Sequence, residues 1–426
     1  MVRGYPNAPG IHTTKSAGEG EVRGHPCPPW RRRAFARGGT MGIAVTGDFP
    51  AGSIEVVDAS DPADIRLRLR PDLGTEVRGA YHFRVTGARG RAVRLRILDV
   101  RDLEADRLAG RDGYEDAWTN TGPHVSYDRA TWFRVPGTMV GRDYVIDHVP
   151  LHDVAYYASW APYPLDRELD LVARVQLSPR VRVETIGTSV LGAPVDLLTI
   201  GEASPDTRVC WVVARQHPSE AMSGYFLEGM LPRLVDEHDP VARQLLDRAV
   251  IYVVPNMNPD GTRLGNTRCN GAGANLNREW ADPSPARSPE VVAVQARMAS
   301  TGVDFFMDCH GDEELRCVFL GGPLEIPSRT PRLASLFAQF ERAWMAVSPE
   351  YELGHGYPGG PPPVADLRMA WNWVAERYGC LGVLLEQPFK DTSWATDPVR
   401  GWSPERATRL GASFVAALNQ VVPGLR

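Results

Sequence analysis

The sequence of 426 residues is poor in lysine and has no long apolar run, and its charge is nearly balanced. Lysine occurs only at Lys15 and Lys390, so nearly all of the 47 basic residues are arginine, a bias from which we infer no function. No apolar run approaches the roughly 20 residues that a transmembrane helix needs. The net charge of -5 gives no electrostatic reason to expect a nucleic acid or an anionic membrane as a partner. We therefore expect neither.

Paired cysteines are also missing. No C-x-x-C pair or regular spacing connects the six cysteines, which are Cys27, Cys210, Cys269, Cys309, Cys317 and Cys380. We expect reduced thiols, which are typical of a cytoplasmic protein. Residues 1–40 are polar, rich in glycine and proline, and lack the apolar core of a secretory signal. We interpret this stretch as a disordered arm or an over-extended start before Met41.

Residues 41–164 show short β-like runs separated by turns rich in glycine, proline and aspartate. The runs are 43–45, 53–57, 65–69, 80–85, 92–98, 131–135 and 143–148. This spacing predicts an antiparallel β-sandwich domain. The histidines of this region show no ligand spacing, and we expect structural roles for them.

The pattern changes after Pro162 and Pro164, where strands begin to alternate with helices. We expect a hairpin at 181–186 and 195–200, and apolar strands at 209–214, 250–255, 303–307 and 381–385. We expect helices at 223–235, 288–300, 330–347, 370–378 and 403–421. The alternation predicts an α/β domain over residues 165–426, with a mixed sheet flanked by helices on both faces.

Three of the apolar strands are followed by polar residues of metal-binding type. His217 and Glu220 follow the first, His310 follows the third and Glu386 follows the fourth. A single His-x-x-Glu is weak evidence, because His310 and Glu313 fit the same pattern. The ends of strands in one parallel sheet converge, however. Together the residues supply three ligands and a spare carboxylate, which predicts a catalytic zinc site.

The loop at 256–280 follows the remaining apolar strand and reads N-M-N-P-D-G and then L-N-R-E-W. The N-P-D-G stretch is strong turn chemistry by itself. Arg268 and Arg278, with Asn277 adjacent, are more informative, because the guanidinium groups of arginine match carboxylates in a bidentate way. Beside a zinc site they predict a substrate that carries a carboxylate.

The order H-P-S-E, N-P-D-G, L-N-R-E-W, D-C-H-G-D and L-L-E-Q-P-F resembles the zinc metallocarboxypeptidases of funnelin type, in particular the bacterial members of their cytosolic carboxypeptidase branch. The resemblance covers about residues 165–426, and the branch also carries a preceding β-sandwich. It implies one zinc ion per chain, held by His217, Glu220 and His310. It also implies that Glu386 is the general base and that Arg268 polarises the scissile carbonyl.

The resemblance further implies that Asn277 and Arg278 hold the terminal carboxylate of a peptide or protein. Engagement of that carboxylate by Arg278 would restrict cleavage to the last residue. The tyrosine that caps the substrate in this family is not clearly placed in the sequence. Tyr357, in H-G-Y-P-G-G, is the better candidate, and Tyr378 falls inside an expected helix.

The sequence departs from the family pattern at Asn275, where many members have an aspartate that orients the first zinc-binding histidine. An amide oxygen still accepts that hydrogen bond but supplies no negative charge, so metal affinity or water basicity is expected to differ. A preference for acidic C-terminal residues would need a basic pocket, for which Arg316 and Arg368 are candidates.

Two alternatives remain open at this point. An N-acyl amino acid hydrolase of the aspartoacylase type has a similar inventory of residues, although the preceding β-rich segment favours a carboxypeptidase. A protein that binds peptide termini without cutting them is the other alternative, and the presence of all three ligands together with Glu386 speaks against it.

Overall fold

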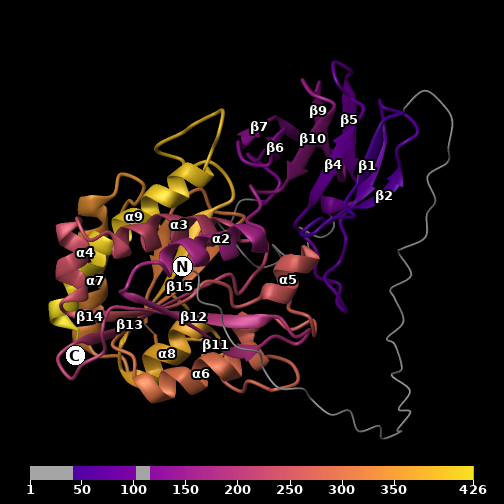
Figure 1. Ribbon diagram of the computed structural model, residues 1–426. Coiled ribbons are helices and arrows are strands. Elements are labelled where there is room, and N and C mark those ends of the chain that lie inside the picture. Colours follow the sequence, from indigo (N-terminus) through magenta and orange to yellow (C-terminus); the bar gives the residue numbers. More distant parts are fainter. Residues whose placement is uncertain (1–41, 102–115, 324, 426) are drawn as a thin grey trace, which may run out of the picture. The chain divides into compact units, whose positions relative to one another are not determined.

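The computed structural model describes residues 42–101, 116–323 and 325–425 (Figure 1). The expected arm at 1–40 and Cys27 lie outside these residues. The five cysteines within them are unpaired and buried. Among the described helices, none combines the length and apolar character of a membrane span.

Two five-stranded sheets form the part before residue 164. The first contains, in spatial order, β1 (Ala44–Thr46), β4 (His82–Thr86), β10 (Val154–Ala158), β6 (His124–Ser126) and β7 (Phe133–Arg134). The second contains β2 (Glu55–Asp58), β3 (Ile65–Arg68), β5 (Val93–Ile97), β9 (Asp143–His148) and β8 (Gly137–Val140). Neighbouring strands are antiparallel except β3 and β5, which pair in parallel because the chain between them crosses to the first sheet as β4.

Alternating side chains build the core of this β-rich part. Val93, Leu95 and Ile97 of β5 are buried, whereas Arg94 between them faces solvent. This period of two is what a strand with one covered face requires. The predicted β-sandwich character of the region is therefore confirmed.

A seven-stranded mixed sheet forms the centre of the second part (Figure 1). Its spatial order is β11 (Val181–Thr188), β12 (Pro194–Ile200), β14 (Ala249–Val254), β13 (Arg208–Ala214), β15 (Phe305–Asp312), β17 (Leu381–Pro388) and β16 (Phe319–Gly321). The four strands β14, β13, β15 and β17 are parallel, and the outer strands join them antiparallel. The expected mixed sheet and its hairpin are confirmed. The strands β15 and β17, however, extend through the polar residues that were expected to follow them.

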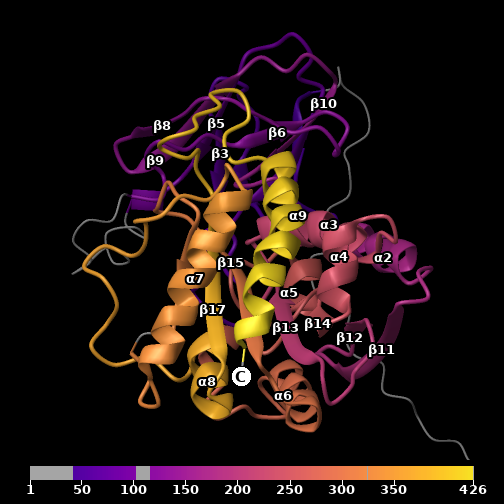
Figure 2. The ribbon, with the colours of Figure 1, turned by 90° about the vertical axis from the view of Figure 1, so that its left-hand side faces the viewer.

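Helices cover both faces of this sheet, as expected. The described helices are α2 (Leu165–Val175), α3 (Met222–Val235), α4 (Pro240–Leu246), α5 (Pro259–Leu264), α6 (Pro289–Thr301), α7 (Pro331–Val347), α8 (Ala370–Tyr378) and α9 (Pro404–Val421), with 3-10 turns η2 (Leu276–Arg278) and η3 (Val422–Gly424). The apolar side chains of α3, α4, α7 and α9 join one core cluster, and those of α6 and α8 join another. Figure 2 shows α7 and α9 in front of the sheet.

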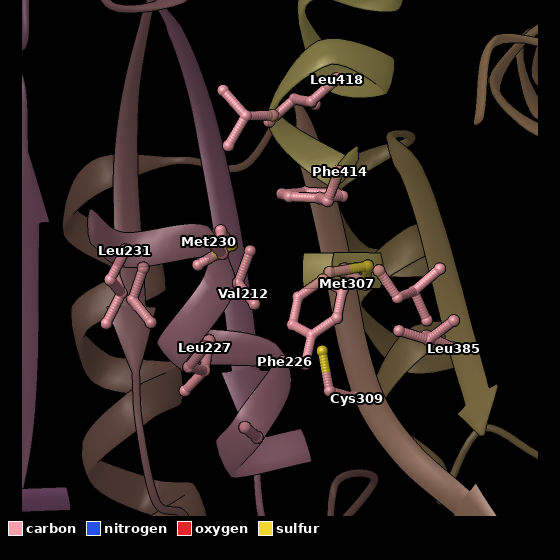
Figure 3. Close-up of a cluster of buried hydrophobic side chains, with 14 of the residues drawn as sticks. Val212, Phe226, Leu227, Met230, Leu231, Met307, Cys309, Leu385, Phe414 and Leu418 are labelled. Atoms are coloured by element: carbon pink, nitrogen blue, oxygen red, sulfur yellow. The ribbon is translucent and has the colours of Figure 1, made fainter. Parts of the chain in front are cut away.

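The larger cluster fixes α3, the helix that starts at Met222, two residues after Glu220. Val212 and Met307 of the sheet face Phe226 of α3 and Phe414 of α9 (Figure 3). The backbones of α3 and α9 approach so closely that a Cβ on Gly411 would lie 1.8 Å from the carbonyl oxygen of Phe226. Only glycine fits this contact, and it anchors the start of the helix beside the predicted metal ligands.

Candidate metal centre

A buried arginine shapes the turn that carries the first two predicted ligands. Arg215 follows β13 in the left-handed region, with φ of 62°, and is buried. Its guanidinium donates to the carbonyl oxygens of Tyr163 at 3.0 Å and Pro218 at 2.9 Å. These bonds hold the chain between His217 and Glu220 in a tight bend, so that Nδ1 of His217 lies 2.7 Å from Oε1 of Glu220. Sequence reasoning did not identify Arg215.

The third predicted ligand comes from the neighbouring strand β15. Nδ1 of His310 lies 2.7 Å from Oε2 of Glu220 and 3.2 Å from Nδ1 of His217. One ligand atom from each residue lies within 4.8 Å of the others, and all three side chains are buried. The structure thus brings together the three residues that the sequence assigned to zinc.

The outer nitrogens of the two imidazoles have different partners. Nε2 of His217 lies 3.0 Å from Oδ1 of Asn275, the position at which the sequence departs from the family pattern. Nε2 of His310 lies 2.9 Å from Oδ2 of Asp308, which also accepts a hydrogen bond from Gln216 at 2.7 Å. Both Nε2 atoms therefore donate, and both Nδ1 atoms are left to bind a metal. The role of Asp308 was missed, although its place two residues before His310 on a strand put both on one face.

The electrostatics of the cluster fit a cation. Burial lowers the pKa of His217. Burial opposes the charged form of His310 too, but the carboxylates of Asp308 and Glu220 outweigh it and raise the pKa of His310 well above its usual range. Burial likewise opposes ionisation of Glu220, yet the two imidazoles hold the pKa of that carboxyl below its usual range. The carboxylates of Glu220 and Asp308 therefore attract positive charge, and with the two imidazole nitrogens Glu220 forms a donor set that zinc fits.

Glu386 lies beside this cluster on β17. It is the parallel register partner of His310 and is 7% exposed. Its Oε1 accepts a hydrogen bond from the hydroxyl of Tyr357 at 2.7 Å, and no group of the described chain bonds Oε2. Burial raises the pKa of Glu386 well above its usual range, against the attraction of His310. Such a carboxyl, beside the predicted metal ligands, has the features of a proton-transfer group.

The predicted arginines lie in the connection between α5 and α6. Nη1 of Arg268 is 3.4 Å from Nε2 of His217. Arg278 ends η2 and donates to the carbonyl oxygen of Asn277 at 2.8 Å. Burial, together with the nearby charge of Arg268, lowers the pKa of Arg278. Two cations held near one another in this way suit an anionic group of a ligand.

Asn277 is buried between the candidate ligand cluster and α8. Its Oδ1 accepts from the backbone N–H of Ala370 at 2.9 Å, and its Nδ2 lies 3.3 Å from Nε2 of His310. Nε2 of His310 donates to Asp308 and so does not accept from Asn277. The Nδ2 group of Asn277 can therefore donate to another acceptor. The arrangement is compatible with its predicted contact to a substrate carboxylate.

Three further candidates are placed by the structure. Tyr378 lies in α8, where its ring packs on Trp373. Arg368 forms an ion pair with Asp366 at 2.8 Å, and Arg316 donates to the carbonyl oxygen of Asp391 at 3.2 Å. Both candidates for a basic specificity pocket therefore have partners of their own.

Two family models match the chain. The cytosolic carboxypeptidase N-terminal domain matches residues 45–160, and the zinc carboxypeptidase model matches residues 169–344. An uncharacterised protein from Zymomonas mobilis is 38% identical over 390 residues, which are 90% of this chain and 98% of that protein. Mouse cytosolic carboxypeptidase 6 is 28% identical over 302 residues, covering 64% of this chain. The matched region spans about half (54%) of the mouse protein.

Solved structures agree with these matches. The metallo-carboxypeptidase from Pseudomonas aeruginosa, in complex with (2-guanidinoethylmercapto)succinic acid, is 38% identical, with a TM-score of 0.84 over 90% of this chain and 100% of that one. The metallo-carboxypeptidase from Burkholderia cenocepacia is 39% identical, with a TM-score of 0.85 over 89% and 99%. The sequence and the fold therefore point to the same family.

Proposed function

We propose that this chain, which belongs to the zinc carboxypeptidase family, removes the C-terminal residue of peptides or proteins with one zinc ion per chain. His217, Glu220 and His310 would hold the ion. A zinc ion in this place would supply Lewis acidity toward a water molecule and the scissile carbonyl. The convergence of these three side chains beside Glu386 is the observation that carries the proposal.

Glu386 is proposed as the general base and acid. Its Oε2 faces no hydrogen-bond donor of the described residues, so this oxygen is available to take a proton from water. The raised pKa of the carboxyl then allows Glu386 to hold that proton and pass it to the leaving amine. General acid–base catalysis of this kind contributes about 10²–10⁴-fold to a rate.

The arginines are proposed to divide two tasks. Arg268, next to His217, would stabilise the negative charge that develops on the carbonyl oxygen. Arg278 and Asn277 would bind the terminal carboxylate, which places the last peptide bond at Glu386. The Pseudomonas aeruginosa enzyme binds a succinic acid derivative, and carboxyl groups are what this pair would recognise. Tyr357 is proposed to cover the bound residue.

A peptide suits the surroundings of the site better than an N-acyl amino acid does. An open cavity lies next to the ligand turn. Tyr81 and Trp118 of the β-sandwich line it together with Ser219 and Glu313 of the catalytic part. We propose that residues upstream of the cleaved bond lie along this cavity. The match to a carboxypeptidase N-terminal domain also supports a peptidase over the acylase and binding alternatives. The relatives named cytosolic carboxypeptidases support a cytoplasmic location.

Peptide digestion tests this proposal. The zinc-loaded protein and its Glu386→Gln variant are incubated with peptides that vary in the last two residues, and products are identified by mass spectrometry. We expect the wild type to release single C-terminal residues. We expect the variant to retain one zinc per chain and to be at least about 100-fold slower.

The same experiment separates the alternatives. Hydrolysis of N-acetyl amino acids in place of peptides would establish an acylase. Peptide binding without cleavage by either protein would establish a binding protein. Either result would contradict the proposed carboxypeptidase activity.

A further inference from the structure

A carboxylate of the β-sandwich domain binds the backbone of the loop that carries Arg268. Asp72 lies between β3 and β4 and is 2% exposed. Its Oδ1 accepts from the backbone N–H of Thr267 at 2.5 Å. Its Oδ2 accepts from the backbone N–H groups of Arg268 at 2.7 Å and Cys269 at 2.8 Å. Three consecutive amides thus converge on one buried carboxylate, and hydrogen bonds to an ionised acceptor are short and strong.

The same loop is also hydrogen-bonded to Ser219, in the turn that carries His217 and Glu220. The carbonyl oxygen of Thr267 accepts from the hydroxyl of Ser219 at 2.8 Å and from its backbone N–H at 3.2 Å. Ser219 stands between His217 and Glu220 in the chain. On the opposite side, the backbone N–H of Ala80 in the sandwich donates to the Thr267 hydroxyl at 3.1 Å. The loop is therefore held between the β-sandwich and the ligand turn.

From this arrangement we infer that Asp72 is a positioning residue of the active centre, through which the β-sandwich domain fixes Arg268 next to His217. The inference rests on the proposed function, because it requires Arg268 to act on the scissile carbonyl. Fixing three successive amides removes most of the freedom of the Arg268 backbone. A group that stabilises developing charge acts well only when it is held in place before the reaction.

A purely structural role for Asp72 makes a different prediction. If Asp72 only joined the two domains, its loss would lower stability and leave turnover of the folded enzyme unchanged. Arg70 provides the comparison, because it also joins the domains: it donates to the carbonyl oxygens of Gly52 and Leu264. Those bonds do not reach residues 267–269.

The test compares full-length, zinc-loaded Asp72→Asn, Arg70→Met and Arg268→Ala with the wild type, and adds the double variant Asp72→Asn/Arg268→Ala. An asparagine retains one acceptor oxygen and turns an N–H₂ group toward the remaining amides. We expect Asp72→Asn to lower kcat by about 10- to 100-fold, with a smaller change in KM and an unchanged zinc content. We expect Arg70→Met to keep kcat within about twofold of the wild type, since the loop bonds are intact.

The double variant decides between the two roles. If Asp72 acts through Arg268, adding Asp72→Asn to Arg268→Ala changes the single-turnover rate by less than about twofold. An undiminished kcat of Asp72→Asn, an equal loss in Arg70→Met, or a full additional loss in the double variant would each overturn the inference. Failure of the wild type to cleave peptides would instead contradict the proposed function itself.

Discussion

The hydroxyl of Tyr357 donates a hydrogen bond to Oε1 of Glu386 over 2.7 Å. The tyrosine ring packs edge-on against Phe319 of β16, with 4.9 Å between ring centroids. Phe319 is in turn the register partner of Glu386 in the antiparallel pair β16–β17. Tyr357 is therefore docked on the strand pair that carries the proposed base, and its hydroxyl binds Oε1 while Oε2 has no hydrogen-bond partner among the described residues.

Removal of this hydroxyl is predicted to weaken catalysis while leaving the fold intact. In Tyr357→Phe the ring contact with Phe319 remains and Oε1 of Glu386 loses a donor. One hydrogen bond to a charged group is worth about 1.5–3 kcal/mol, so we expect kcat/KM for peptides to fall by roughly 10- to 100-fold. Steady-state kinetics measures this, with the thermal midpoint as a check on folding. A kcat/KM equal to that of the wild type would show that the hydroxyl contributes nothing to the reaction.

Arg278 is predicted to determine the requirement for a free C-terminus. In Arg278→Met a charge-assisted contact to the substrate carboxylate is lost, so we expect KM for free peptides to rise by about 10- to 100-fold. C-terminally amidated peptides lack that carboxylate, and the substitution should hardly affect their slow cleavage. Arg377→Met, which removes an exposed arginine on α8, is the control and should behave as the wild type. An equal loss for amidated peptides would mean that Arg278 does not bind the carboxylate.

Much of the site could be predicted because parallel strands end at one edge of a sheet. His217, His310 and Glu386 are far apart in the sequence, but each follows or ends an apolar run, and the three runs are neighbours in the sheet. The expected strand ends were wrong at His310 and Glu386, which lie inside β15 and β17. Polar residues at these positions favoured a loop, whereas the structure buries His310 and Glu386 as register partners on neighbouring strands.

Other parts of the site have no local signal. Asp72 stands 196 positions before Arg268, in another domain, and binds backbone amides that no side-chain pattern records. Arg215 holds the ligand turn through carbonyl oxygens in the same way. Interactions of side chains with the backbone across domains depend on the tertiary fold, so a single sequence does not reveal them.

Asn275 is predicted to limit the affinity for zinc. Asn275→Asp keeps the acceptor oxygen at 3.0 Å from Nε2 of His217 and adds a negative charge behind that ligand. Partners of this kind change metal affinity by about 10- to 100-fold, and we expect the variant to bind zinc at least about 10-fold more tightly. Competition with a chelator measures the dissociation constant. Gln339→Glu adds the same charge on the exposed surface of α7 and should leave affinity unchanged. An unchanged dissociation constant for Asn275→Asp would contradict the prediction.

Glu290, in the first turn of α6, is predicted to make the protein less stable at neutral and higher pH than at acidic pH. Burial raises the pKa of this fully buried carboxyl to about 7, from an ordinary value of 4.5. Below about pH 4.5 the carboxyl is protonated in both the folded and the unfolded chain, so its ionisation does not change the free energy of unfolding. As the pH rises from about 4.5 to 7, the unfolded chain loses the proton first, and the free energy of unfolding falls.

The Glu290→Gln variant tests this dependence. Glutamine does not ionise, and its oxygen still accepts from Asn270, which lies 3.3 Å from the carboxylate. We therefore expect the variant to gain stability over the wild type at pH 8, by at most about 3 kcal/mol, and to gain much less at pH 5. Urea unfolding at both pH values, at a fixed excess of zinc, measures the difference. Glu237→Gln removes an exposed carboxylate and should show no such change with pH. The same stability difference for Glu290→Gln at both pH values would show that the carboxyl ionises normally in the folded protein.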